Sequence, residues 1–188
     1  MKMRLPSGYL NITAFKQEIE DFQSNVFVSS GFILANAGLQ SSEGFEFDLL
    51  FSPVPSIDIT FGGLVMDSNY DSFVGSSAGD MSGTKPENVH DDSFTSAITY
   101  NWSQGQTDGY VRLNHLYSGP TWTRLDPADN DVMCAAGFCQ KTKDTLNFSA
   151  GITMGNLDII LYGNNINDDE YLTSKFPEVG DPLASSFN

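Results

Sequence analysis

Hydrophobic and polar residues alternate with a period of two along most of this chain. The alternation is clearest in Thr145–Met154, where every second residue is apolar and the residues between are Thr, Asn, Ser and Gly. A strand with one apolar and one polar face has this pattern. Six further segments share it: Leu10–Ala14, Phe45–Phe51, Ile57–Val65, Ser93–Trp102, Tyr110–Tyr117 and Leu157–Leu161. No segment sustains a helical period, so the sequence predicts an all-β fold of about seven strands.

Short and long connections alternate between these predicted strands. Short turns are indicated by the prolines of Phe51–Ile57, by Asn101–Gly109 and by the Gly155-Asn156 pair. The long polar segments are Asp21–Ala35, Asp67–Asp92, Ser118–Lys143 and Asn165–Asn188. In an antiparallel up-and-down meander every second connection lies at the same end of the sheet. The short turns should therefore gather at one end and the long segments at the other, as in outer-membrane barrels.

Strand length and the placement of aromatic and acidic residues also favour a membrane barrel. The strands are expected to be about 9–11 residues long, as a tilted bilayer crossing requires. The aromatic residues Tyr100, Trp102, Tyr110 and Tyr117 fall at strand ends, where an interfacial girdle would place them. Carboxylates such as Asp58 lie on the face opposite the apolar one. Alternation alone leaves two other interpretations open: a stand-alone acidic all-β binding module, and a small autonomous outer-membrane barrel.

Composition narrows the function classes. The 188 residues suffice for one domain, and 24 acidic against 9 basic residues give a formal net charge of -15. This balance argues against nucleic-acid binding, which needs a basic surface. The 14 Phe and 7 Tyr argue against a disordered acidic chain. No apolar stretch approaches the roughly 20 residues of a spanning helix, and the first residues lack the apolar run of a secretory signal.

Two stretches resemble TonB-dependent receptors, the bacterial outer-membrane proteins that import scarce nutrients. Asn36–Asp48 looks like the family's Asn-Ala-Gly segment followed by Gly-x-Glu, and Leu161–Tyr171 resembles its Asn-Ile/Leu-x-Asp-x-x-Tyr motif. Gly79–Ser93, between them, resembles a Gly-x-x-Pro loop of the family. The motif positions are Asn36, Gly38, Gly44, Glu46, Asn164, Asn167, Asp168 and Tyr171. We interpret them as structural: the glycines allow a strand to turn sharply, and the Asn and Asp side chains cap a strand end.

The resemblance implies that residues 1–188 are part of one receptor barrel in the cell outer membrane, in contact with its lipid. Nothing corresponds to the family's plug domain, its N-terminal barrel strands or its last strand. Contact with the TonB energy-coupling protein is therefore expected only through the absent plug. The ligand would be a small nutrient such as a ferric siderophore, cobalamin or an oligosaccharide. The resemblance implies neither an enzyme nor a cofactor.

A few loop residues are candidates for chemistry. Cys134 and Cys139 are predicted to form a disulfide, since two thiols without a nearby His are an incomplete zinc site. Tyr70, Trp122 and Arg124 are the loop residues best able to stack on or pair with a ligand. The acidic runs Asp126–Asp131 and Asn165–Glu170 lack the spacing of a calcium loop, so no metal site is predicted. No nucleophile has a recognisable base partner, so no hydrolytic site is predicted either.

Overall fold

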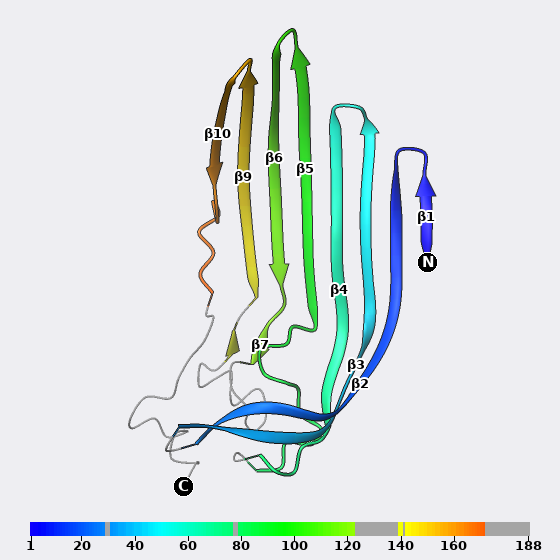
Figure 1. Ribbon diagram of the computed structural model, residues 1–188, viewed down its shortest axis with the longest axis vertical. Coiled ribbons are helices and arrows are strands. Elements are labelled where there is room, and N and C mark those ends of the chain that lie inside the picture. The colour runs from blue at the N-terminus through cyan, green and yellow to red at the C-terminus, as the bar shows by residue number, and fades with distance from the viewer. Residues whose placement is uncertain (29–30, 77–78, 123–138, 141, 172–188) are drawn as a thin grey trace.

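The main element of the structure is one antiparallel sheet of eight strands, shown in Figure 1. The computed structural model describes residues 1–28, 31–76, 79–122, 139–140 and 142–171. The strands pair in the order β1-β2-β3-β4-β5-β6-β9-β10. Their bounds are β1 Lys2–Leu5, β2 Gly8–Val28, β3 Gly31–Val54, β4 Ile57–Ser72, β5 Asp92–Gln104, β6 Thr107–Ser118, β9 Lys143–Met154 and β10 Leu157–Gly163. A separate ladder of β7 Thr121–Trp122 and β8 Cys139–Gln140 lies between β6 and β9 in sequence.

This open meander confirms the predicted all-β, up-and-down fold. The predicted strands all form, and β1 is the additional strand of the main sheet, because four residues are too few to display an alternation. The two-residue strands β7 and β8 are not predicted from the sequence either. Strands β1 and β10 are the two edges of the described sheet. Within the described part of the chain, no helix is long and apolar enough to cross a membrane.

Four two-residue turns lie at one end of the sheet, the upper end in Figure 1, which we call the turn end. They are residues 6–7, 55–56, 105–106 and 155–156. Gly105 and Gly155 have φ of 67° and 61°, left-handed values that tight hairpin turns require and that glycine adopts without strain. The connections that follow β4, β6 and β10 leave from the opposite end, here called the loop end. The predicted separation of short from long connections holds at these positions.

The segment Asp21–Ala35, predicted as a long loop, is instead mostly strand. Strands β2 and β3 pair from Gly8 opposite Phe51 to Val28 opposite Gly31, which makes them 21 and 24 residues long. The expected strand length of about 9–11 residues is therefore wrong for these two strands, and also for β4, which has 16 residues. The ladder continues because backbone pairing needs no apolar face, whereas the prediction relied on apolar alternation. Asp21 has a φ of 53°, and Figure 1 shows the ribbon bending where it leaves the sheet and crossing below the other strands.

The register places the predicted apolar residues on one face, which we call the outer face. One row across it pairs Ile59 with Ile98, Ile98 with Leu113, and Leu113 with Phe148. The eleven residues expected to share this face all do: Phe45, Phe47, Leu49, Ile57, Ile59, Phe61, Phe148, Ile152, Leu157, Ile159 and Leu161. The opposite, inner face carries Glu46, Asp58, Arg112 and Asp158 among other polar residues.

Aromatic side chains on the outer face lean over glycines of neighbouring strands. A Cβ added at Gly63 would lie 2.5 Å from Phe94 and 2.6 Å from Phe47, whose ring centroids are 5.9 Å apart. Trp102 covers Gly109 in the same way. Tyr110, predicted to belong to the outer girdle, instead covers Gly151 on the inner face, because its register puts it there. These aromatic–glycine pairs fill space that a glycine leaves in a strand.

Candidate functional site

The most deeply buried residues lie at the loop end, in the connection between β4 and β5 and in the strands beside it. We call residues 73–76 and 79–91 the loop platform. This segment folds back on β4: Tyr70 N–H donates to Thr84 O at 2.9 Å, and Gly83 N–H donates to Tyr70 O at 2.6 Å. Met81 N–H donates to Phe73 O at 3.0 Å, and Thr84 Oγ1 donates to Met81 O at 2.7 Å. The platform therefore has its own hydrogen-bonded structure.

A small apolar core holds the platform against the strands. Tyr70, Phe73 and Met81 have exposed fractions of 2%, 0% and 1%. The rings of Tyr70 and Phe73 meet edge to face with centroids 5.0 Å apart. Phe22 approaches Tyr70 from the bent part of β2, at 6.3 Å between centroids. This core joins β2, β4 and the platform.

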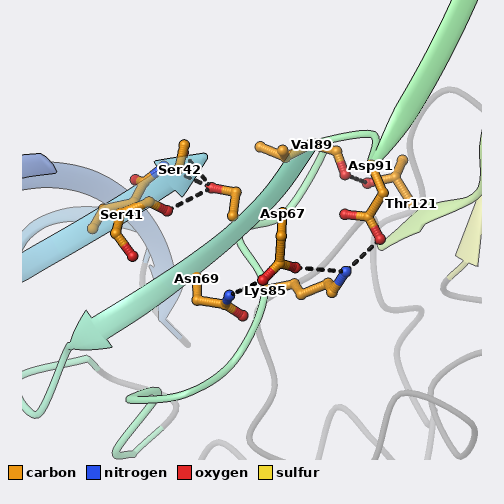
Figure 2. Close-up of polar contacts among 10 residues, drawn as sticks. Ser41, Ser42, Asp67, Asn69, Lys85, Val89, Asp91 and Thr121 are labelled. Atoms are coloured by element: carbon orange, nitrogen blue, oxygen red, sulfur yellow. Dashed lines mark hydrogen bonds and ion pairs between the residues drawn. The ribbon is translucent and has the colours of Figure 1, made fainter. Parts of the chain in front are cut away.

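Lys85 ties the platform to the sheet, as Figure 2 shows. Its Nζ forms ion pairs with Asp91 and, at 3.4 Å, with Asp67 of β4. Asp67 also accepts a hydrogen bond from Asn69 at 2.8 Å. Burial lowers the pKa of Lys85, but Asp91 and Asp67 together raise it by more than burial lowers it. The net pKa of Lys85 therefore lies above the ordinary value. The ammonium group therefore stays charged and links the platform to β4.

Hydrogen bonds also join the platform to the start of the connection that follows β6. Thr121 Oγ1 donates to Val89 O at 2.8 Å, a bond drawn in Figure 2. His90 Nδ1 lies 2.7 Å from the carbonyl oxygen of Gly119, so this nitrogen is the donor. Gly119 N–H in turn donates to Asp92 O at 2.8 Å. The two connections, β4–β5 and β6–β7, are joined by these bonds.

A buried polar cluster lies beside the platform on β3 and β4. The hydroxyl oxygens of Ser42 and Ser68 are 2.8 Å apart, and Ser68 Oγ donates to Ser41 O at 3.2 Å (Figure 2). Gln40, 8% exposed, donates from Nε2 to Ser68 Oγ at 3.4 Å. Its Oε1 atom is buried and has no partner among the described residues.

A second polar network closes the edge of β9 beyond the end of β10. Asn167 Oδ1 accepts from Leu146 N–H at 2.8 Å, and its Nδ2 donates to Asp144 O at 2.6 Å. Asp169 Oδ2 accepts from Asp144 N–H at 2.7 Å. Asn165 and Asp169 exchange two bonds of 3.0 Å, from Asn165 Nδ2 to Asp169 O and from Asp169 N–H to Asn165 Oδ1. These side chains take the place of a strand partner along this part of β9.

Comparison with known proteins identifies the family. A family model described as TonB dependent receptor-like, beta-barrel matches residues 2–166. The chain belongs to this family. No curated protein gives a match.

Two solved structures share the fold of this TonB-dependent receptor segment. The ferric yersiniabactin uptake receptor FyuA from Yersinia pestis is 19% identical, with a TM-score of 0.72. The match covers 96% of this chain and 26% of FyuA. BauA, the ferric preacinetobactin receptor from Acinetobacter baumannii, is 13% identical over 90% of this chain and 24% of its own, with a TM-score of 0.66. The segment thus spans about a quarter of each receptor's length.

The residues of the first family motif lie on β3. Gly44 sits where β4 passes closely, since an added Cβ would lie 2.2 Å from Val65 O, and Gly38 lies beside Ser72. Both glycines lie inside the continuous strand β3, and the register of β3 with β4 shifts between Leu39 and Gln40, next to Gly38. The role of the glycines in letting the strand turn out of a loop or bulge stays a prediction. Asn36 is exposed and pairs with Gln23. Glu46 lies on the inner face, opposite Thr13.

In the second motif, three predicted residues have distinct surroundings. Asn164 is exposed beside Asn147 and Tyr162 on the inner face. Asp168 has a φ of 54°, and its N–H donates to Asn165 O at 3.0 Å. The ammonium group of Lys143 lies over the ring of Tyr171, 4.3 Å from the ring centroid. The side-chain cap along the edge of β9 is thus formed by Asn167 together with Asn165 and Asp169. Asn165 and Asp169 were not among the predicted motif positions.

The predicted ligand contacts are not brought together by the described residues. Tyr70 is 2% exposed and buried under the platform. Trp122 lies in β7, with its backbone paired to Cys139. Arg124 and Cys134 lie outside the described residues. The ligand-contact role and the Cys134–Cys139 disulfide therefore stay predictions.

Sequence reasoning missed Lys85, which organises the platform. A signal was present, because Lys85 is the sole Lys or Arg between Asp67 and Asp92, a segment with six carboxylates. Among the described residues, no group of three or more His, Cys, Asp or Glu is placed to hold a metal ion.

Proposed function

We propose that this chain forms part of the wall and of the extracellular rim of an outer-membrane receptor that takes up a scarce nutrient. The candidate ligands are a ferric siderophore, cobalamin or an oligosaccharide. The chain supplies wall strands and rim loops to this transport and catalyses no reaction.

The observation that carries the proposal is the contrast between the two faces of the sheet. Large apolar side chains on the outer face are exposed to a degree that soluble monomers rarely show: 58% for Phe45, 48% for Ile98 and 66% for Leu161. Among the described residues, no second layer covers them. Bilayer lipid is the partner that such a face requires, and a polar face turned to a lumen is the usual complement.

The contrast also argues against the soluble binding module. Such a module would bury its apolar face against a second sheet or helix. It would also protect its edges, whereas β1 and β10 are unpaired on one side among the described strands. A receptor barrel resolves both problems with lipid outside and further strands at the edges.

The turns and loops give the sheet an orientation. Short turns face the periplasm in outer-membrane barrels, and longer loops face outside. The turn end would then lie in the periplasm, and the loop platform would stand at the cell surface. The platform's folded structure would offer a fixed surface beside the entrance to the lumen.

Ferric siderophores are the first ligand class to test. The two solved receptors of similar fold are named for ferric yersiniabactin and ferric preacinetobactin. Their low identity shows a shared fold and leaves the ligand of this receptor to experiment.

The test is uptake by the complete receptor that contains this segment. It would be expressed in a bacterium lacking its own siderophore and cobalamin receptors, and radiolabelled ferric siderophores, cobalamin and oligosaccharides would be offered in turn. We expect one class to accumulate, and accumulation to stop when the proton gradient is collapsed. A receptor that assembles in the outer membrane but imports none of the three classes would contradict the proposal. Failure to reach the outer membrane would contradict the localisation itself.

A further inference from the structure

On the inner face of the described sheet Arg112 stands apart from the other cations, and its surroundings point to an anionic partner. Arg112 lies on β6, midway between the turn end and the loop end. The other inner-face cations of the described sheet are Lys2 and Arg4, on the edge strand β1, and Lys143, at the loop end of β9. Arg112 is therefore separate from every other inner-face positive charge of that sheet.

The guanidinium group of Arg112 is largely unsatisfied. Among the described residues it makes a single hydrogen bond, from Nη1 to Thr99 Oγ1 at 3.0 Å, and it forms no ion pair. A guanidinium has five N–H donors, so most of them are available. The nearest carboxylate by register is that of Asp58, opposite Thr99 and two strands away from Arg112. Its oxygens already accept from Ser52 Oγ at 2.6 Å and Asn101 Nδ2 at 3.0 Å.

The neighbours of Arg112 supply further donors around one concavity. Ser149 lies directly opposite on β9, and Tyr162 lies opposite Ser149 on β10. With Asn114, Asn147 and Asn164, they line a shallow hollow of about 400 Å³. Tyr162 is 71% exposed, so the hollow is open to the lumen side. Guanidinium, hydroxyl and amide groups together suit an oxygen-bearing anion.

We propose that Arg112 is the centre of an oxyanion-binding site on the lumen wall, with Ser149 and Tyr162 as secondary donors. Ionisable groups within membrane walls face cavities and mark functional positions, and Arg lines pores that select anions. The ligand class is a carboxylate or a chemically similar oxyanion. It is carried either by a solute in the lumen or by another segment of the same receptor. The inference rests on the proposed function, because it requires the inner face to border a lumen.

The first measurement probes the local charge. Ser149→Cys, in the complete receptor, places a thiol one strand away from Arg112. Its reaction rates with an anionic and a cationic methanethiosulfonate reagent are compared, with and without Arg112→Gln. A positive charge at this distance should favour the anionic reagent by about tenfold in the ratio of the two rates. Arg112→Gln should remove that preference, and Arg112→Lys should keep most of it.

The control measurement and the measurement of where the anion comes from use the same receptor preparation. Arg4→Gln removes an equal charge from the inner face of β1 and should leave the ratio unchanged. Competition by inorganic phosphate that slows the anionic reagent only when Arg112 is present would indicate a solute-borne oxyanion. A thiol closed to both reagents, with a photo-crosslinker at position 162 reaching an Asp- or Glu-bearing segment of the receptor, would indicate an internal carboxylate.

Two results would overturn the site: a reagent ratio that Arg112→Gln leaves unchanged, or a crosslink to a segment without a carboxylate. Both measurements use receptor already assembled in the membrane. Their failure would therefore leave nutrient uptake untouched, whereas failure of uptake would not change the reagent ratio.

Discussion

Apolar side chains meet opposite conditions in the outer face and in the loop platform. Ile98 and Leu161 on the outer face are 48% and 66% exposed, whereas Phe73 and Met81 in the platform are 0% and 1% exposed. Apolar side chains are thus exposed on the outer face of the wall and enclosed at the loop end. The wall therefore relies on surroundings that the sheet does not supply, and the platform carries its own core.

This difference determines what each region can do alone. Removing a large apolar side chain from water is worth about 1.5–3 kcal/mol. The platform gains this energy from Tyr70, Phe73 and Met81 packing within the chain. In the wall the same gain would come, under the proposed function, from lipid against the outer face. Under the proposed function the wall is a membrane element, whereas the platform is a small folded unit with a core of its own.

The largest expected effect concerns the wall without its surroundings. The sheet formed by this chain alone leaves two edges of unpaired backbone at β1 and β10, which bilayer hydrocarbon does not tolerate. We expect the isolated chain, exported with a signal peptide, to give no protease-resistant, heat-modifiable species in the outer membrane and no transport. Gel migration with and without boiling measures this. A heat-modifiable band would instead indicate a small autonomous barrel.

The next effect tests whether the platform core is self-sufficient. Phe73→Ala should destabilise the platform by about 3–5 kcal/mol, because it empties a fully enclosed site. Cleavage of the platform by proteinase K in the assembled receptor should then accelerate by about a hundredfold or more. The neighbouring Val74 is 70% exposed, so Val74→Ala is the matched control and should change cleavage little. Equal cleavage of the two variants would show that the platform core does not hold this loop.

Assembly of the wall should be sensitive to a charge introduced on the outer face. Ile59→Arg puts a cation in the row of Ile98, Leu113 and Phe148, and should cost about 2–4 kcal/mol and impair assembly. Asp58→Asn alters the adjacent inner-face position, keeps an acceptor for Ser52 and should be tolerated. Heat-modifiable migration of the two variants compares the faces directly. Equal assembly of both would reject the assignment of lipid and lumen sides.

The outer face could be predicted from sequence because a strand with one apolar face repeats an apolar residue at every second position. Phe148 and Ile152, for example, lie on the same face whatever the neighbouring strands do. The short turn at residues 105–106 then fixes the pairing of Ile98 with Leu113. Ile59 and Ile98 lie on strands joined by the long β4–β5 connection, so their pairing does not follow from a short turn. Tyr110 shows the limit: its aromatic character suggested the girdle, while its position in the alternation placed it inside.

The loop end could not be predicted in the same way. The ladder between β2 and β3 beyond Glu20 depends on backbone bonds that no side-chain pattern records. Phe73 and Met81 meet through a folded loop, so their spacing follows no strand or helix period. The cap at Asn167 was anticipated in kind, because Asn and Asp side chains bond backbone groups readily. Its actual partners on β9 depend on where β10 ends.

The smallest expected effect is that of the ion pairs of Lys85. Lys85→Met should weaken the platform by about 0.5–1 kcal/mol, because the Lys85 side chain is partly exposed and solvent screens the pairs. Cleavage of the platform by proteinase K should accelerate about two- to fivefold at neutral pH.

The effect of Lys85 should also depend on pH. The pKa of Lys85 is raised in the folded platform, so the stability that its charge contributes is fully present below the unfolded value of 10.5 and is lost as pH rises through the folded value. The difference between wild type and Lys85→Met should therefore be constant from neutral pH to about pH 9 and should vanish in stronger alkali. Lys16→Met, which breaks an exposed pair with Glu18, should leave platform cleavage unchanged at every pH. A difference that persists above the folded pKa would show that the aliphatic stem of Lys85, and not its charge, holds the platform to β4.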